Sequence, residues 1–244
     1  MKLSVVIPVH NEAANIEPLI EELIETLNGK FDYEMIYVDD ASTDNTPDQL
    51  KKMLKTHPRL RVITHRVCCG QSTAIFTGIQ KASSPLIATL DGDMQNDPRD
   101  IPLLVDMYLR HSEEGEVMIT GFRAKRHDTL WRKVSSRIAN TVRQGILKDS
   151  TMDTGCGIKV FSRSFFLTLP YFDHMHRFLP ALSKRAGATV LSVPVNHRPR
   201  HHGVSNYGTL DRLMAGVVDL AGVFWLIKRF KNPEITEVTV NYGN

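Results

Sequence analysis

Short apolar runs alternate with helical patterns through the first half of the chain, and this alternation constrains the fold more than any other feature. Five runs have the length of buried strands: residues 3–7, 35–38, 60–64, 86–90 and 117–120. Between them, apolar residues recur at the i, i+3, i+4 spacing of an amphipathic helix. Strands joined by such helices form a mostly parallel sheet with helices on both faces. We therefore expect an α/β fold.

Local signals predict where several of the helices begin and end. Asn11 is placed to cap a helix that ends at Gly29, and Thr46 before Pro47 predicts the start of the next helix. Further helices are expected over residues 71–81 and 101–109. Beyond Gly121 the pattern is weaker. There we expect helices over 131–147, 178–185 and 210–230, and strands near 157–161 and 190–195.

Size and composition are typical of a soluble globular protein. The 244 residues, 42% apolar and 23% charged, predict one domain over residues 1–232 and a peripheral tail over 233–244. The three cysteines are odd in number, two are adjacent, and none has zinc-site spacing, so a reducing cytoplasmic location is expected. We find no signal-peptide pattern and no apolar stretch of the roughly 18 residues that a membrane span needs.

Polar residues follow three of the expected strands, at the sheet edge where ligands of such folds bind. Pro8, Asn11 and Glu12 follow the first strand, Asp39 and Asp40 the second, and Asp91, Asp93 and Gln95 the fourth. Each group alone could also be a turn or a helix cap. Two carboxylates one residue apart repel each other unless a cation lies between them. Mg²⁺ or Mn²⁺ takes such oxygen ligands and suits a diphosphate leaving group.

Two clusters of basic residues suit a phosphate ligand. The first comprises Arg123, Lys125, Arg126, Arg132, Lys133 and Arg137, with Asp128 as its one acid, and the second comprises His197, Arg198, Arg200, His201 and His202. Guanidinium groups match phosphate oxygens in geometry and charge. The alternative is a solvated basic surface. Nucleic acid is disfavoured as a partner, because no nucleic-acid-binding motif accompanies the charge.

The expected C-terminal helix, over residues 209–231, is apolar with a basic end. Phe224 and Trp225 precede the run Lys228, Arg229, Phe230 and Lys231. Apolar residues with tryptophan and a basic end suit a helix that lies in the surface of an anionic membrane. An ordinary helix that packs against the sheet would have a similar pattern, so both interpretations stay open.

Three motifs occur together and in order: Pro8-x-x-Asn11-Glu12, then Asp39-Asp40-x-Ser42-x-Asp44-x-Thr46, then Asp91-x-Asp93-x-Gln95-x-x-Pro98. As a set they resemble the family 2 glycosyltransferases, which have the Rossmann-like GT-A fold. The resemblance implies a metal site of Asp91 and Asp93, with Gln95 as a further ligand. It also implies that Asp39 or Asp40 contacts the base and ribose of a nucleotide-sugar donor. The remaining donor-site residues would be Pro8, Asn11, Glu12, Asp91 and Arg200.

Motifs in the second half resemble the polyprenyl-phosphate branch of that family. They are Gly121-x-Arg123, Trp131-Arg132, Ser136-Arg137-x-Ala139-Asn140 and Arg200-x-x-Gly203-x-Ser205-Asn206-Tyr207. The resemblance implies that Arg123, Arg132 and Ser136 bind the phosphate of a polyprenyl-phosphate acceptor, and it favours UDP over GDP in the donor. The sequence departs from the branch at Cys68-Cys69-Gly70, at Lys159 and at Asn206. These departures leave the sugar and the base open.

The expected reaction is an inverting displacement in which Asp91 and Asp93 act through the metal and Asp153 orients a substrate. A saccharide or protein hydroxyl is the alternative acceptor, and it would require a carboxylate base. A non-catalytic nucleotide-sugar-binding subunit is the second alternative. The expected partners also include the cytoplasmic surface of a membrane and a further copy of the chain.

Overall fold

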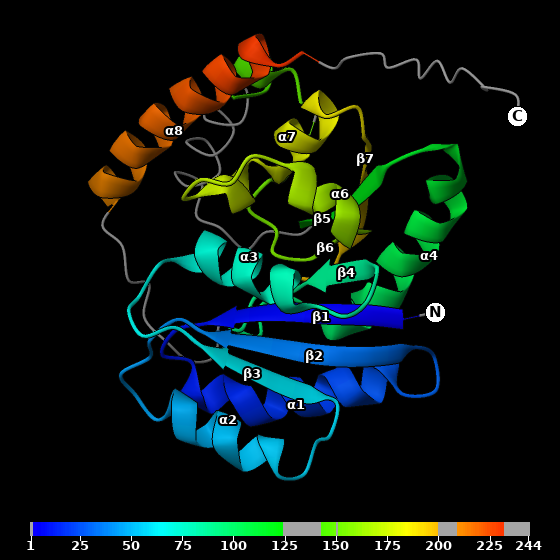
Figure 1. The fold of residues 1–244 in the computed structure, drawn as a ribbon, viewed down its shortest axis with the longest axis vertical. Coiled ribbons are helices and arrows are strands. Elements are labelled where there is room, and N and C mark those ends of the chain that lie inside the picture. Colours follow the sequence, from blue (N-terminus) through cyan, green and yellow to red (C-terminus); the bar gives the residue numbers. More distant parts are fainter. Residues whose placement is uncertain (1, 124–142, 150, 200–208, 232–244) are drawn as a thin grey trace, which may run out of the picture.

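The computed structural model describes residues 2–123, 143–149, 151–199 and 209–231. Within that part of the chain lies a seven-stranded sheet with the order β3-β2-β1-β4-β6-β5-β7 (Figure 1). The strands are β1 (Lys2–Val9), β2 (Asp32–Asp39), β3 (Leu60–Thr64), β4 (Leu86–Thr89), β5 (Val117–Arg123), β6 (Lys159–Ser162) and β7 (Thr189–Val195). Every neighbouring pair is parallel except those of β6, which runs antiparallel to both β4 and β5. The expected mostly parallel sheet is confirmed.

Helices cover both faces of this sheet. They are α1 (Ala13–Leu27), α2 (Thr46–Leu54), α3 (Gln71–Lys81), α4 (Ile101–His111), α6 (Arg163–Thr168), α7 (Leu179–Arg185) and α8 (Thr209–Arg229), with 3₁₀ turns at η1 (Pro98–Asp100), η2 (Ser112–Glu114) and η3 (Met175–Arg177). One apolar cluster joins the sheet to α1, α2 and α4, and the other joins it to α3, α6, α7 and α8. Central strand β1 serves both clusters because side chains alternate along a strand: Val5 and Ile7 belong to the first cluster and Val6 to the second.

The two predicted helix caps were wrong, because both side chains bond across loops instead. Asn11 has a left-handed backbone (φ 58°), and its Oδ1 accepts a hydrogen bond from the Thr43 backbone N–H at 2.8 Å. Thr46 is the first residue of α2 rather than its cap, and its Oγ1 accepts from the Glu12 N–H at 2.9 Å. These bonds join the loop after β1 to the loop after β2, where the first two polar motifs lie.

The second half of the chain adds the reversed strand. The strands expected near residues 157–161 and 190–195 are observed as β6 and β7, and the helix expected over 178–185 as α7. Because β6 runs opposite to β4, the segment that leads into β6 lies at the edge where β1, β2 and β4 end. Most of the helix expected over 131–147 lies outside the described residues, and residues 143–147 are helical.

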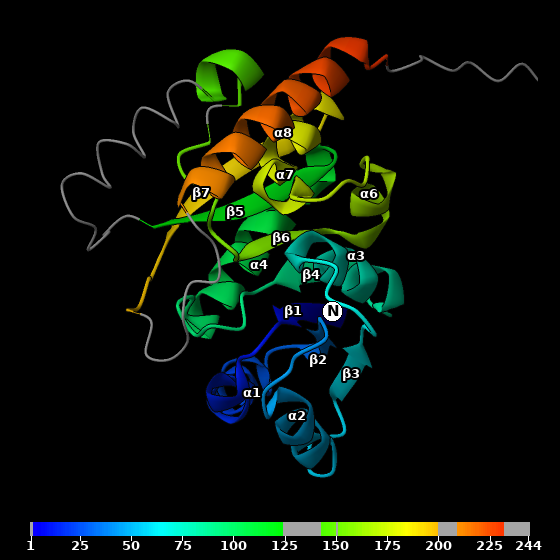
Figure 2. The same cartoon turned by 90° about the vertical axis from the view of Figure 1, so that its left-hand side faces the viewer.

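The C-terminal helix α8 confirms the helix expected there and lies against α7, at the opposite end of the molecule from α2 (Figures 1 and 2). One of its faces is packed, since Val223 is only 1% exposed. Its other face shows apolar side chains to solvent, among them Val217, Val218, Phe224 and Trp225. None of the helices within the described residues is long and apolar enough to cross a membrane.

Candidate active site

The loops after β1, β2 and β4 meet the beginning of α3 around a pocket of about 600 Å³, which we call the donor pocket. Many of the predicted site residues line it: Pro8, Asn11, Glu12, Asp40, Asp91 and Asp93. Cys68 and Gly70, from the segment that leads into α3, and Gln71, its first residue, form part of its wall. The edge of the parallel sheet thus brings together motifs that are far apart in the sequence, as the fold class predicted.

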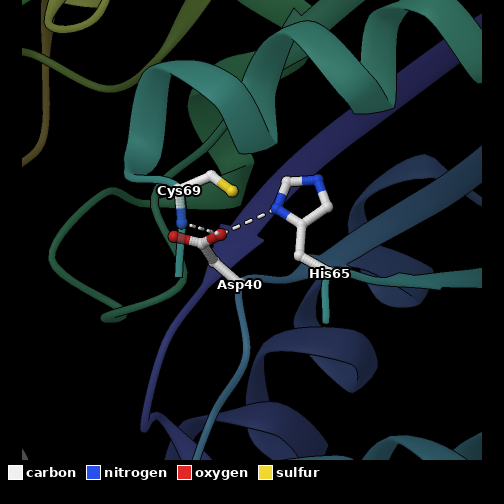
Figure 3. A group of neighbouring side chains, drawn as sticks. All are labelled: Asp40, His65 and Cys69. Atoms are coloured by element: carbon white, nitrogen blue, oxygen red, sulfur yellow. Dashed lines mark hydrogen bonds and ion pairs between the residues drawn. The ribbon is translucent and has the colours of Figure 1, made fainter. Parts of the chain in front are cut away.

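Asp40 joins the end of β2 to the beginning of α3 (Figure 3). Its carboxylate accepts hydrogen bonds from the backbone N–H groups of Gly70 (2.7 Å) and Cys69 (2.9 Å), from His65 Nδ1 (2.7 Å) and from the Cys68 thiol (3.3 Å). Burial raises the pKa of Asp40, but these bonds outweigh burial and lower its pKa below the ordinary value. Asp40 is therefore an ionised residue that fixes the start of α3.

The same group could be read as a metal site, because ligand atoms of Asp40, His65 and Cys69 lie within 4.8 Å of one another. Both oxygens of Asp40 already accept hydrogen bonds, however, and His65 Nε2 lies 3.0 Å from Thr77 Oγ1. These bonds account for the cluster as a set of contacts that hold the segment before α3 against the end of β2. The acid pair after β4 has different surroundings.

Asp91 and Asp93 flank a glycine that the fold requires. A Cβ atom at Gly92 would lie 2.5 Å from Cγ1 of Val9 on β1, so no side chain fits between the two acids. The Asp93 carboxylate accepts a hydrogen bond from the Gln95 N–H at 3.1 Å. The loop is thus held closely against β1, with its two carboxylates at the edge of the donor pocket.

The electrostatics of the acid pair favour a bound cation. Burial and, after it, the charge of Asp93 raise the pKa of Asp91 to about 6, against the opposing charges of Lys159 and Arg123 and a 2.8 Å hydrogen bond from the Gln71 amide. The described protein groups therefore compensate the two negative charges incompletely. Mg²⁺ and Mn²⁺ prefer oxygen ligands, and either ion would compensate the remaining negative charge of the two carboxylates. The residues present therefore fit such an ion.

A second pocket, of about 420 Å³, adjoins Asp91 and shares Asp91 and Gln71 with the donor pocket. It is also lined by Gln95, Cys156, Gly157, Lys159, His176 and Arg177. A Cβ at Gly157 would lie 2.5 Å or less from the Asp91 carboxyl atoms, so a side chain there would displace this carboxylate. Lys159 is buried and its ammonium donates to the carbonyl of Cys156. Burial lowers the pKa of Lys159, and the charges of Cys156 and Asp91 oppose that shift.

Arg123 and Asp153 form one unit. The guanidinium binds the carboxylate through two bonds, Nε to Oδ2 at 2.6 Å and Nη2 to Oδ1 at 2.8 Å, and the Arg123 backbone N–H donates to Oδ2 at 3.2 Å. Both side chains are largely buried. The sequence assigned Arg123 to an acceptor phosphate and Asp153 to a substrate, without predicting this contact. Such a fork holds the guanidinium in a single orientation.

The remaining predicted site residues lie apart from the donor pocket or outside the described residues. Asp39 is fully buried, and its Oδ1 accepts from the Ser42 N–H at 3.0 Å. Its Oδ2 is buried and has no hydrogen-bond partner among the described residues. Gln95 borders the second pocket rather than the donor pocket. Arg132, Ser136 and Arg200 lie outside the described residues.

The segment that precedes Arg200 is nevertheless well fixed. The backbone N–H of Arg198 donates to the carbonyl of Gln95 at 2.9 Å. Its guanidinium binds Glu22 on α1 at 2.7 Å and Asp97 at 2.8 Å. The described chain therefore reaches residue 199 beside the loop that carries the acid pair.

Residues 4–169 match the family model described as glycosyl transferase family 2. The chain belongs to this family. It is 34% identical over 242 residues to the dodecaprenyl-phosphate galacturonate synthase of Rhizobium johnstonii, which covers 96% of this chain and 69% of that protein. It is 31% identical over 212 residues to the undecaprenyl-phosphate 4-deoxy-4-formamido-L-arabinose transferase of Edwardsiella ictaluri, which covers 85% of this chain and 63% of that protein. The chain thus spans about two thirds of the length of these relatives.

The fold of this family 2 glycosyltransferase is also that of solved structures. The glucosyl-3-phosphoglycerate synthase of Mycobacterium tuberculosis, crystallised in complex with Mn²⁺, UDP and glucosyl-3-phosphoglycerate, matches with a TM-score of 0.69. The match covers 95% of this chain and 81% of that chain at 21% sequence identity. The expected GT-A architecture is confirmed.

Three neighbours of Asp91 in the glycosyltransferase site were not predicted: Gln71, which donates a hydrogen bond to it, Gly157, which lies against its carboxyl group, and Lys159, whose charge acts on it. The sequence contained a weak indication for Lys159, because the family that it resembles usually has arginine at this position. The signals for Gln71 and Gly157 were absent, since a glutamine at a helix start and a glycine before a strand are common. The pairing of β4 with β6 explains why Gly157 and Lys159 lie near the acid pair, whereas Gln71 reaches Asp91 from the beginning of α3.

Proposed function

We propose that this chain is an inverting glycosyltransferase that moves a sugar from a nucleotide-diphosphate sugar to a polyprenyl phosphate. The product would be a lipid-linked sugar donor for cell-envelope glycans or for lipid A modification. The match with relatives named for transfer to dodecaprenyl and undecaprenyl phosphate, along nearly the whole chain, carries this proposal. The geometry of the site supports it at the donor end.

Asp91 and Asp93, with Gln95 nearby, are the residues that would hold Mg²⁺ or Mn²⁺. When bound, the ion supplies positive charge that stabilises the departing nucleotide diphosphate. Asn11, which joins the first two loops, and Asp40, which fixes α3, shape the pocket in which the nucleotide would lie. UDP is favoured over GDP by the sequence resemblance alone.

The bonds that Asp153 makes with Arg123 support a phosphate acceptor rather than a hydroxyl acceptor. A phosphate monoester is largely ionised at neutral pH, so it can attack without a strong general base. A hydroxyl acceptor would need a carboxylate base, but Asp153 is occupied by both nitrogens of the Arg123 fork. The paired Arg123 lies close enough to Asp91 to affect its pKa, and it would orient the acceptor phosphate together with Arg132 and Ser136.

The test is transfer by the full chain from UDP- and GDP-sugars to undecaprenyl phosphate in detergent, with product mass as the readout. We expect a lipid-linked sugar whose formation requires Mg²⁺ or Mn²⁺. Transfer to saccharide or peptide hydroxyls, and none to the lipid phosphate, would establish the alternative acceptor. Donor binding without turnover on any acceptor would indicate a nucleotide-sugar-binding subunit.

We further propose a peripheral location on the cytoplasmic face of the membrane, through the exposed face of α8. Phe224 and Trp225 are 40% and 59% exposed, whereas Val223 on the packed face of the helix is buried. Replacing Phe224 and Trp225 by serine should weaken liposome binding and leave thermal stability nearly unchanged. A fall in thermal stability without a change in liposome binding would indicate that these two side chains pack in the core. A homo-oligomer stays a prediction, to be measured by sedimentation.

A further inference from the structure

A groove of about 540 Å³ lies between residues 145–148, α7 and α8, and it shares no lining residue with the donor pocket or the second pocket. We call it the α7–α8 groove. Its lining residues are Gly145, Ile146, Leu147, Lys148, Ala181, Lys184, Arg185, Phe224, Ile227 and Lys228. The set contains four cations and no carboxylate, and the other members are apolar or glycine.

Arg185 is the most informative member of the groove. Its guanidinium lies over the ring of Phe230, 4.1 Å from the ring centre, and its Nε is buried without a hydrogen-bond partner among the described residues. Burial lowers the pKa of Arg185, and no carboxylate of the described residues opposes this shift. A guanidinium stays charged at any ordinary pH, so this side chain retains both a positive charge and an unused donor.

The lysines of the groove are likewise not neutralised by acids within the described part of the chain. Lys184 donates to the backbone carbonyl of Lys148 at 2.9 Å, and the Lys228 ammonium lies 5.6 Å from the centre of the Phe224 ring. Carbonyl and ring contacts position a cation without cancelling its charge. The groove therefore presents an array of positive charges held in place by neutral groups.

Within the described residues, Asp149 beside Lys148 and Asp219 on α8 are engaged elsewhere. Asp149 follows Lys148, and the charge of Lys184 acts on its carboxyl, but that carboxylate is buried against Arg143 with an Nη1 to Oδ2 distance of 2.9 Å. Asp219 of α8 binds His174 at 2.9 Å. Neither acid lines the groove, so its net charge is positive.

Apolar surface continues from the groove along α8. Phe224 and Ile227 form part of the groove itself, and exposed Val217, Val218 and Trp225 extend the apolar surface along the helix. Val217, Phe224 and Lys228 recur at helical spacing on one side of α8. An occupant that satisfies both parts of this surface has a negatively charged head and an apolar tail.

We propose that the α7–α8 groove binds the anionic headgroup of a bilayer phospholipid, whose acyl chains lie beside the apolar face of α8. The groove would thereby set the orientation of the chain on the membrane, in addition to the affinity that an amphipathic helix alone supplies. The described lining of this site contains none of the residues assigned to the acceptor phosphate, and the proposal does not depend on the identity of the transferred sugar.

The experiment is co-sedimentation of the full chain with vesicles of phosphatidylcholine, alone or mixed with phosphatidylglycerol. The variant Lys184→Gln/Arg185→Gln removes two cations from the groove. Its matched control, Lys30→Gln/Lys55→Gln, removes two exposed cations near α1 and α2, at the end of the molecule opposite α8. At about 1 kcal/mol for each cation near an anionic surface, the groove variant should partition roughly 30-fold less onto the anionic vesicles, and the control should change little.

Equal losses in the groove variant and its control would overturn the proposal, because they would reflect net charge alone. Equal binding of the wild-type chain to both vesicle types would overturn it as well. Tight binding of soluble glycerol phosphate without vesicles would assign the groove to a free phosphate instead. Because Lys184 is exposed, Lys184→Gln alone tests the groove if the double variant unfolds, with an expected loss of about fivefold. These readouts need no activity, so a failed transfer assay would not affect them.

Discussion

Replacing Gly157 by alanine tests whether the position of the Asp91 carboxylate controls the use of the donor. A Cβ at this position would lie 2.5 Å from Asp91 Oδ1 and closer still to the other carboxyl atoms, where ordinary contacts begin at 3.4 Å. The carboxyl group must therefore move by about 1 Å. A misplacement of that size at a reacting centre costs on the order of 100-fold in rate. We expect a similar loss in kcat/KM for the nucleotide sugar.

The fold should tolerate this change better than the activity does. Asp91 is a side chain at the rim of two pockets, so relieving the clash should cost no more than about 1–3 kcal/mol of the free energy of unfolding. Gly222→Ala in α8 is the control, because a Cβ there meets nothing within 4 Å. Kinetics, nucleotide calorimetry with Mn²⁺ and thermal unfolding should be measured on both variants. A folded Gly157→Ala protein with wild-type kcat/KM would refute the reasoning.

Three further predictions concern the metal, the buried ion pair and pH. Asp93→Ala and EDTA should each abolish turnover, and added Mn²⁺ should restore turnover of the EDTA-treated wild type but not of the variant. Full turnover by protein that has been shown to contain no metal would exclude a role for the metal. Arg123→Ala should weaken acceptor binding roughly tenfold or more, since a charge-assisted contact contributes about 1.5–3 kcal/mol. A double-mutant cycle with Asp153→Asn should show strong coupling between the two residues. Additive effects of the two substitutions in steady-state kinetics would contradict a joint role. Burial raises the pKa of Glu34, but hydrogen bonds from Ser4, Arg61 and Ser83 lower it from 4.5 to about 2. The ionised Glu34 therefore stabilises the fold fully above pH 4.5, and this effect is lost as the pH falls through about 2. Glu34→Gln should reduce the free energy of unfolding by about 1–2 kcal/mol at pH 7 and hardly change it at pH 2. Equal stability of the variant and the wild type at pH 7, measured by denaturant titration, would contradict this prediction.

The donor half of the site could be predicted because it follows from strand geometry. Parallel strands place their carboxyl ends at one edge, so polar residues that follow β1, β2 and β4 must lie near one another. Asn11, Asp40 and Asp91 met this expectation and line the donor pocket. The predicted caps failed because a polar side chain near a helix start can bond either its own helix or a neighbouring loop. Only the folded loops decide between these partners.

The other half of the site could not be predicted because it depends on the reversed strand. Nothing in the sequence before β6 indicates its direction, and that direction brings Gly157 and Lys159 to Asp91. The pairing of Arg123 with Asp153 joins residues that are 30 positions apart. A pattern of basic residues indicates that phosphate could bind, but it does not indicate which of the arginines already has a carboxylate partner.

The reversed strand also has a consequence for synthesis. As the chain leaves the ribosome, β1 to β4 appear first and contain everything needed for the four parallel strands on one side of β6, with β4 at their open edge. Asp91 and Asp93 are then already present, whereas Lys159 is not, and the edge of β4 has no partner. Translation must proceed through β6 before that edge closes and a buried lysine reaches the acid pair. The nascent protein therefore acquires the two carboxylates early, and the buried lysine that acts on the pKa of Asp91 late.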